Sequence, residues 1–101
     1  MSDVGVQGSE NSIVYDLYRI NGVVYCVNCW INLASCIHEL TPRSKRPKDW
    51  HEIDNRVPLC AVCHHNAHQV GTANSASDIR RRRNLFITNF GLRVPFDTDD
   101  E

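Results

Sequence analysis

Two cysteine pairs constrain this chain more than any other feature of its sequence. They are Cys26-x-x-Cys29 and Cys60-x-x-Cys63. Two intervening residues let both sulfurs of a pair reach one ion from a tight turn, and two such turns close a tetrahedral shell. Four thiolates suit Zn²⁺ and leave no open position for water or substrate. The spacing therefore predicts a structural zinc ion, and the alternative is two unrelated buried cysteine pairs.

The size of the chain makes such a metal ion important for folding. A chain of 101 residues is one domain with a modest core. Polar composition predicts a disordered N-terminus at 1–12 and an acidic disordered tail at 97–101, which leaves a zinc-binding domain at 13–96. A domain of that size gains considerably from a metal staple.

The composition also bounds the location of the protein. The chain has no apolar run of about 18 residues and no visible signal peptide, so we expect no membrane span and a cytoplasmic protein. In a reducing compartment, five cysteines indicate metal binding or catalysis rather than disulfides. The fifth, Cys36, lies in an apolar stretch and is expected to be a core residue.

Hydrophobic spacing predicts an α+β domain. The expected elements are a helix over 13–20, a strand over 33–40, a short strand over 56–59 and a helix from the second cysteine pair to about 70. A last helix is expected to begin at Ser75 or Ser77 and to end at Gly91.

A second set of possible metal ligands surrounds the second cysteine pair. His64 and His68 are four residues apart on one helix face, a spacing at which two imidazoles can chelate one ion. His38 lies near the end of the first predicted strand, and Asn55 lies just before the second. The four residues can also be ordinary packing or hydrogen-bonding side chains beside the zinc.

The order strand, loop, strand and helix with these residues resembles the ββα-metal, or HNH, nuclease family. The resemblance spans about 18–71 and rests on His-Glu-Leu-Thr-Pro-Arg-Ser at 38–44, Asn-Arg-Val-Pro-Leu-Cys-Ala-Val-Cys-His at 55–64, and His68. It implies a small zinc-stapled ββα-metal fold with flanking helices, similar to the small HNH proteins of phages. By the same resemblance His38, His64 and His68 hold a catalytic divalent ion (Mg²⁺, Mn²⁺, Ni²⁺ or Zn²⁺), and Asn55 fixes the base or the loop geometry.

The sequence departs from the family pattern at the general base, which is normally histidine and here is Glu39. A carboxylate is a weaker base than imidazole, yet it is deprotonated at neutral pH. Glu39 can therefore act as the base, join the metal shell, or mark a member without activity. His51 and His65 are substitutes for the base, although His65 is turned about 100° from His64 and is expected to face away.

Basic residues gather in the middle of the chain and indicate a polyanionic partner. Residues 11–96 hold 11 basic and 6 acidic side chains, a net charge of +5, although the whole chain has a net charge of −1. The alternative is an ordinary solvated surface. The candidate nucleic-acid contacts are Arg43, Lys45, Arg46, Lys48, Arg56, Arg80, Arg81, Arg82 and Arg83.

Together these features predict a metal-dependent DNA endonuclease or nickase with little intrinsic sequence specificity. The alternative is a catalytically degenerate, zinc-stabilised HNH-like module that binds DNA or a protein partner, of phage or host origin, in phage DNA packaging or host interference. The residue that favours the alternative is Glu39.

Overall fold

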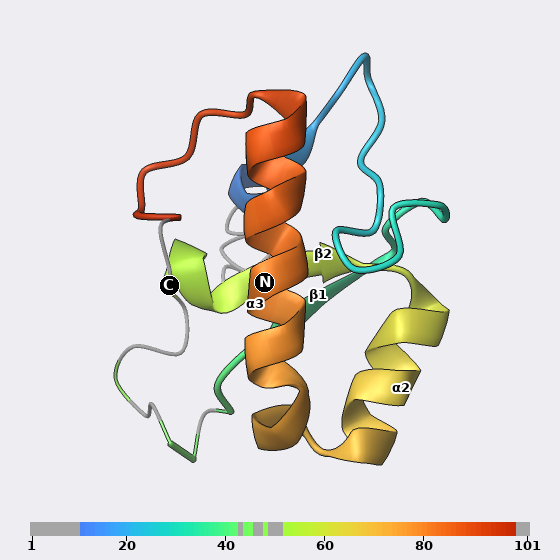
Figure 1. The fold of residues 1–101 in the computed structure, drawn as a ribbon, viewed down its shortest axis with the longest axis vertical. Coiled ribbons are helices and arrows are strands. Elements are labelled where there is room, and N and C mark those ends of the chain that lie inside the picture. The colour runs from blue at the N-terminus through green and yellow to red at the C-terminus, as the bar shows by residue number, and fades with distance from the viewer. Residues whose placement is uncertain (1–10, 43, 46–47, 49–51, 99–101) are drawn as a thin grey trace, which may run out of the picture.

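The computed structural model describes residues 11–42, 44–45, 48 and 52–98 (Figure 1). The named elements are β1 (Cys36–Glu39), a 3-10 turn η1 (Ile53–Asn55), β2 (Arg56–Leu59), α2 (Ala61–Val70) and α3 (Thr72–Phe90). Residues 11–18 are also helical. The predicted α+β class is therefore confirmed, and β2 and α2 have the predicted positions.

The first helix ends two residues earlier than predicted. Residues 11–18 are helical, so Asn11 and Ser12 belong to this helix and not to a disordered terminus. The rest of that predicted terminus lies outside the described residues. The backbone then turns at Asn21 and Gly22, which both have positive φ, at 50° and 86°. A two-residue turn of this kind suits Asn-Gly and pairs the flanking residues, here Ile20 with Val23.

The two strands form an antiparallel sheet. Its register pairs Cys36 with Leu59 and Glu39 with Arg56. β1 is shorter than the predicted strand at 33–40, because the preceding residues pair with the loop of the first cysteine pair instead. Leu33 bridges Tyr25, for example.

The junction between α2 and α3 is a single glycine. Gly71 has φ 110°, a conformation that favours glycine. It is both the C-cap of α2 and the N-cap of α3. α3 therefore begins at Thr72, before the predicted caps Ser75 and Ser77. The Ser75 hydroxyl lies inside the helix and donates to the Gly71 carbonyl at 3.0 Å, so it does not cap.

One apolar core joins the elements. α3 runs along the molecule in Figure 1, with α2 beside its N-terminal end, and the two helices contact each other. The largest fully buried side chains of the apolar core are Tyr18, Phe86, Leu40, Leu59, Val14, Val27 and Val57.

Among the residues that the structure describes, no helix combines the length and the hydropathy needed to cross a membrane.

Candidate functional site: a cysteine cluster and a histidine cluster joined by one helix

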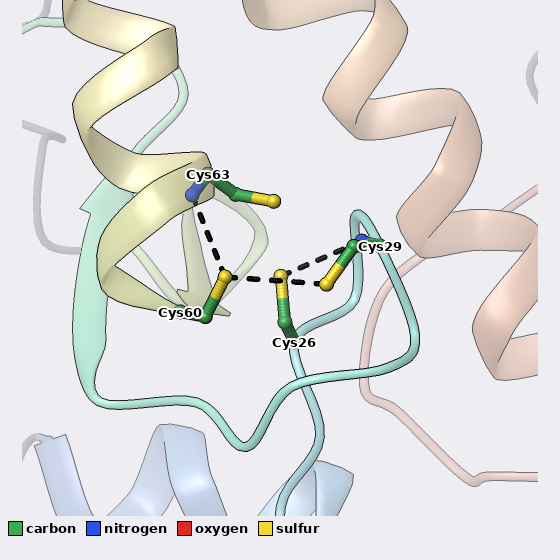
Figure 2. Close-up of side chains that lie close together, drawn as sticks. All are labelled: Cys26, Cys29, Cys60 and Cys63. Atoms are coloured by element: carbon green, nitrogen blue, oxygen red, sulfur yellow. Dashed lines mark hydrogen bonds between the residues drawn. The ribbon is translucent and has the colours of Figure 1, made fainter.

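The four paired cysteines face one another in space. Figure 2 shows their side chains converging from two segments of the chain, and their sulfurs all lie within 4.8 Å of one another. The sulfurs of Cys29 and Cys60 are 3.9 Å apart. A tetrahedral zinc site with Zn–S bonds of about 2.3 Å requires sulfurs about 3.8 Å apart. Cys26, Cys29, Cys60 and Cys63 therefore lie close enough to bind a metal ion such as zinc.

Backbone turns hold both cysteine pairs in the same way. The amide of Cys29 donates to the Cys26 sulfur at 3.5 Å, and the amide of Cys63 donates to the Cys60 sulfur at 3.4 Å (Figure 2). The side-chain amide of Asn32 also donates to the Cys60 sulfur, at 3.6 Å. N–H donors of this kind stabilise thiolate over thiol, which is the form that binds metal.

The pKa values of these thiols show why the cluster needs a cation. Burial raises the pKa of Cys26 and raises that of Cys63 to about 12. Burial opposes ionisation of Cys60 too, but the donors from Cys63 and Asn32 outweigh it and lower the pKa of Cys60 to about 6. Without a central cation the four sulfurs would not all be thiolates at neutral pH. A divalent ion supplies the missing charge.

Three imidazoles form a second cluster next to the first. The ligand nitrogens of His38, His64 and His68 lie within 4.8 Å of one another. The Nε2 atoms of His64 and His68 are 3.1 Å apart. Tetrahedral Zn–N bonds of about 2.0–2.1 Å require nitrogens about 3.3–3.4 Å apart, so the spacing is compatible with chelation of one divalent cation.

His38 is the most buried of the three histidines. It is 1% exposed, and its Nε2 atom has no hydrogen-bond partner among the described residues. Such orphaned buried atoms are rare in native proteins and call for an explanation. Burial, followed by the neighbouring His64 and His68, lowers the pKa of His38 to about 4. The ring is therefore neutral at pH 7 and keeps a lone pair available.

Glu39 lies at the same cavity as the three histidines, although the alternation of a regular strand would send adjacent side chains to opposite faces. It is the last residue of β1 and is half-buried. The cavity of about 270 Å³ is lined by Ile37, His38, Glu39, Pro42, His64, His68 and Thr72.

Asn55 fixes the chain that follows β1. Its side-chain oxygen accepts from the Thr41 amide at 2.8 Å, and its side-chain nitrogen donates to the Thr41 carbonyl at 3.1 Å. The Asn55 carbonyl accepts from the Leu40 amide at 2.8 Å. Asn55 is fully buried and holds the loop beside the histidines, without lining their cavity.

Two polar residues near the ligand clusters were not predicted from the sequence. Thr72 lines the histidine cavity, and its hydroxyl lies 3.4 Å from Nδ1 of His68. A hydrogen bond at Nδ1 leaves Nε2 of His68 as the nitrogen available to a metal ion. The four-residue spacing from His68 to Thr72 predicts a contact only if one helix runs through Gly71. In the structure α2 ends at Val70 and α3 begins at Thr72. Asn32 beside Cys60 had no comparable signal.

The structure corrects two of the predicted nucleic-acid contacts. Arg56 is 7% exposed and donates to the Asn11 side chain. Arg83 is 2% exposed, donates to the Asp54 carbonyl at 2.6 Å and lies over the ring of Phe96. Both arginines make internal contacts that hold segments of the chain together. Neither side chain is therefore exposed on the surface where a nucleic acid could bind.

The other predicted residues divide between exposed positions and positions outside the described residues. Arg81, Arg82, Lys45 and Lys48 are exposed, and Arg80 is half-buried. His65 is exposed and contacts Gln69, so it faces away from the histidine cavity as expected. Cys36 is half-buried in β1, outside the four-cysteine cluster. Arg43, Arg46 and His51 lie outside the described residues.

No family model, no characterised protein and no solved structure matches this chain. The resemblance to HNH nucleases therefore remains a prediction from the sequence motifs.

Proposed function

We propose that this protein is a metal-dependent DNA endonuclease or nickase of the ββα-metal type. The single observation that carries the proposal is the histidine cavity. Three ligand nitrogens lie within 4.8 Å of one another, and a carboxylate, that of Glu39, lines the same cavity. Hydrolysis of a phosphodiester needs these two kinds of group, a cation at the phosphate and a base for water.

Each side chain has a role that its environment supports. His38, His64 and His68 would hold a divalent ion, which neutralises phosphate charge and stabilises the leaving oxygen. Glu39 accepts a proton from the attacking water, and Asn55 keeps the loop after β1 in place. Thr72 orients the ring of His68. Three imidazoles favour Mn²⁺, Ni²⁺ or Zn²⁺ over Mg²⁺.

The experiment that tests this function is cleavage of a supercoiled plasmid. The zinc-loaded protein is supplied with Mg²⁺, Mn²⁺, Ni²⁺ or added Zn²⁺, and nicked and linear products are measured. We expect cleavage with the transition metals and loss of cleavage in His64→Ala and His68→Ala. His65→Ala is the matched control, because His65 is on the same helix but exposed and outside the cavity.

A metal titration of the same variants separates binding from catalysis. Wild-type protein and His65→Ala should bind one divalent ion more than the His64→Ala and His68→Ala variants bind. Equal metal binding in all four proteins would refute the histidine site, and equal cleavage by all four would refute the catalytic role.

The second candidate function is a non-catalytic, zinc-stabilised module that binds DNA or a protein partner. Glu39 favours it, because the HNH-like motif has histidine at the general-base position. Under this alternative the protein cuts no DNA, whichever metal is supplied.

The nuclease and the DNA-binding form of the second candidate both predict salt-sensitive binding to DNA through phosphate contacts. Lys45 and Lys48 are exposed and follow β1, the strand that carries His38, in the sequence. Arg81 and Arg82 are exposed on α3. Log affinity should fall with log salt, with a slope near about −0.9 for each duplex phosphate neutralised. Lys45→Ala and Lys48→Ala should each make the slope shallower. Arg19→Ala, an exposed arginine paired with Asp16, is the charge-matched control. A slope of zero would exclude the phosphate contacts.

A further inference from the structure

We propose that a second cavity, between the first cysteine loop and α3, binds one unpaired nucleotide of a nucleic-acid strand. The cavity has a volume of about 590 Å³ and is lined by Cys29, Trp30, Asp78, Arg81, Arg82 and Leu85. It shares no lining residue with the histidine cavity. In Figure 1 the loop that carries the first cysteine pair lies beside α3, and the Arg82 side chain bonds the Asn28 carbonyl across this junction.

Trp30 supplies a fixed aromatic wall. Its indole nitrogen donates to the Val27 carbonyl at 2.8 Å, and its ring packs edge-on against Phe86 and Phe90, with centroids 5.5 and 6.0 Å away. The residue is only partly buried. A partly exposed ring held in one orientation is a platform on which a base can stack with little loss of side-chain freedom.

The backbone conformation of Trp30 helps to fix the direction of its side chain. Its φ is 66°, in the left-handed region, which glycine adopts without a steric penalty. The turn itself is closed by a backbone hydrogen bond from Trp30 to Cys26 at 2.9 Å, which any residue can donate. The contacts of the indole with Val27, Phe86 and Phe90 offset the cost of this backbone conformation and hold the ring at the cavity.

Two arginines supply the cationic side of the cavity. Arg82 donates one hydrogen bond, from Nη1 to the Asn28 carbonyl at 3.2 Å, which holds its side chain across the junction. Arg81 lies 3.7 Å from the Asp78 carboxylate, and both of these side chains are mostly exposed. A guanidinium has five N–H donors in a fork that matches phosphate oxygens, so both arginines can donate to a phosphate at the cavity.

Together the Trp30 ring and the two arginines favour an unpaired nucleotide over other polyanions. A base inside a duplex keeps both faces stacked on its neighbours, so only an unstacked base can lie on Trp30. The cavity volume lies in the range of sites for small organic ligands, which exceeds the space that a phosphate ion needs. An acidic peptide would engage the arginines but would make no use of the ring. The partner is therefore single-stranded nucleic acid.

The test uses the full, zinc-loaded chain and the fluorescence of Trp30. The chain has two tryptophans, so Trp50→Phe leaves Trp30 as the reporter. Titration with a short single-stranded oligothymidylate at low salt should quench this fluorescence. Arg81→Ala and Arg82→Ala should each weaken binding about tenfold, while Arg19→Ala, outside the cavity, should leave it within about twofold. His64→Ala should bind the oligonucleotide normally whether or not the protein cleaves DNA, which separates this site from the proposed function.

Several results would overturn the inference. Equal quenching of Trp30 at equal affinity by the same oligonucleotide in duplex form would refute nucleotide recognition. Competition by polyglutamate as strong as that by the single strand would refute it too. Unchanged binding in both arginine variants would exclude the cavity. A loss of zinc from Arg82→Ala with unchanged oligonucleotide affinity would assign Arg82 to charge balance at the thiolates instead. Trp30→Phe keeps a ring and should retain most of the binding, which is followed by the anisotropy of a labelled oligonucleotide because the variant lacks the Trp30 reporter.

Discussion

Removal of zinc is expected to unfold this protein. A structural zinc ion contributes on the order of 10 kcal/mol to folding, which is comparable to the whole stability of a small domain. The four cysteines link the loop before β1 to the start of α2, and three of them are buried. Treatment with a strong chelator should therefore abolish the cooperative thermal transition followed by circular dichroism. Elemental analysis should find one tightly held zinc ion at this cluster.

Two cysteine variants give the matched comparison. Cys60→Ser should lose the zinc ion and the folded state, because it removes a ligand that also begins α2. Cys36→Ser should keep both, since Cys36 lies outside the cluster. A protein that stays folded without zinc, or a Cys60→Ser variant as stable as wild type, would contradict the structural role of the ion.

Replacement of Glu39 by glutamine is expected to abolish metal-dependent cleavage while DNA binding persists. Glutamine keeps the size of the side chain and removes the base, and a positioned general base contributes about 10²–10⁴-fold to rate. The initial rate of plasmid nicking should fall by that factor. Glu52→Gln, an exposed carboxylate outside the histidine cavity, is the control and should cleave at the wild-type rate.

The converse substitution distinguishes the two candidate functions. Glu39→His places the base of the HNH motif in the same cavity and should retain or raise activity near neutral pH. If wild type cleaves nothing under any metal and Glu39→His does cleave, the protein is a binding module with a degenerate site. If Glu39→Gln cleaves as fast as wild type, the base is another residue, and His51 becomes the first to examine because His65 faces away.

The two clusters are mechanically connected through α2. Cys60 caps the helix, Cys63 lies in its first turn, and His64 and His68 follow on the same ten-residue segment. A metal ion that ties Cys60 and Cys63 to the first cysteine loop therefore also sets the direction in which both histidines point. For this reason loss of the structural ion should remove the histidine site along with the fold.

Some of the site could be predicted from the sequence because its geometry is local. A Cys-x-x-Cys spacing brings two sulfurs together within one turn, and a four-residue spacing puts His64 and His68 on one helix face whatever the rest of the chain does. The same helix periodicity correctly predicted that His65 faces away from the histidine cavity. The strand Arg56–Leu59 was predicted from the apolar residues that lie between a polar loop and Cys60.

The tertiary structure decided everything that depends on which surfaces become buried. The four consecutive arginines of α3 are equivalent in sequence, yet packing placed Arg83 inside the protein and left Arg81 and Arg82 outside. Long-range packing also brought Trp30 of a cysteine loop against Phe86 of α3, and His38 of β1 against His64 of α2. Spacing along a chain determines contacts within a turn or a helix. Burial and contacts between distant segments depend on how the elements share one core, and no local pattern contains that information.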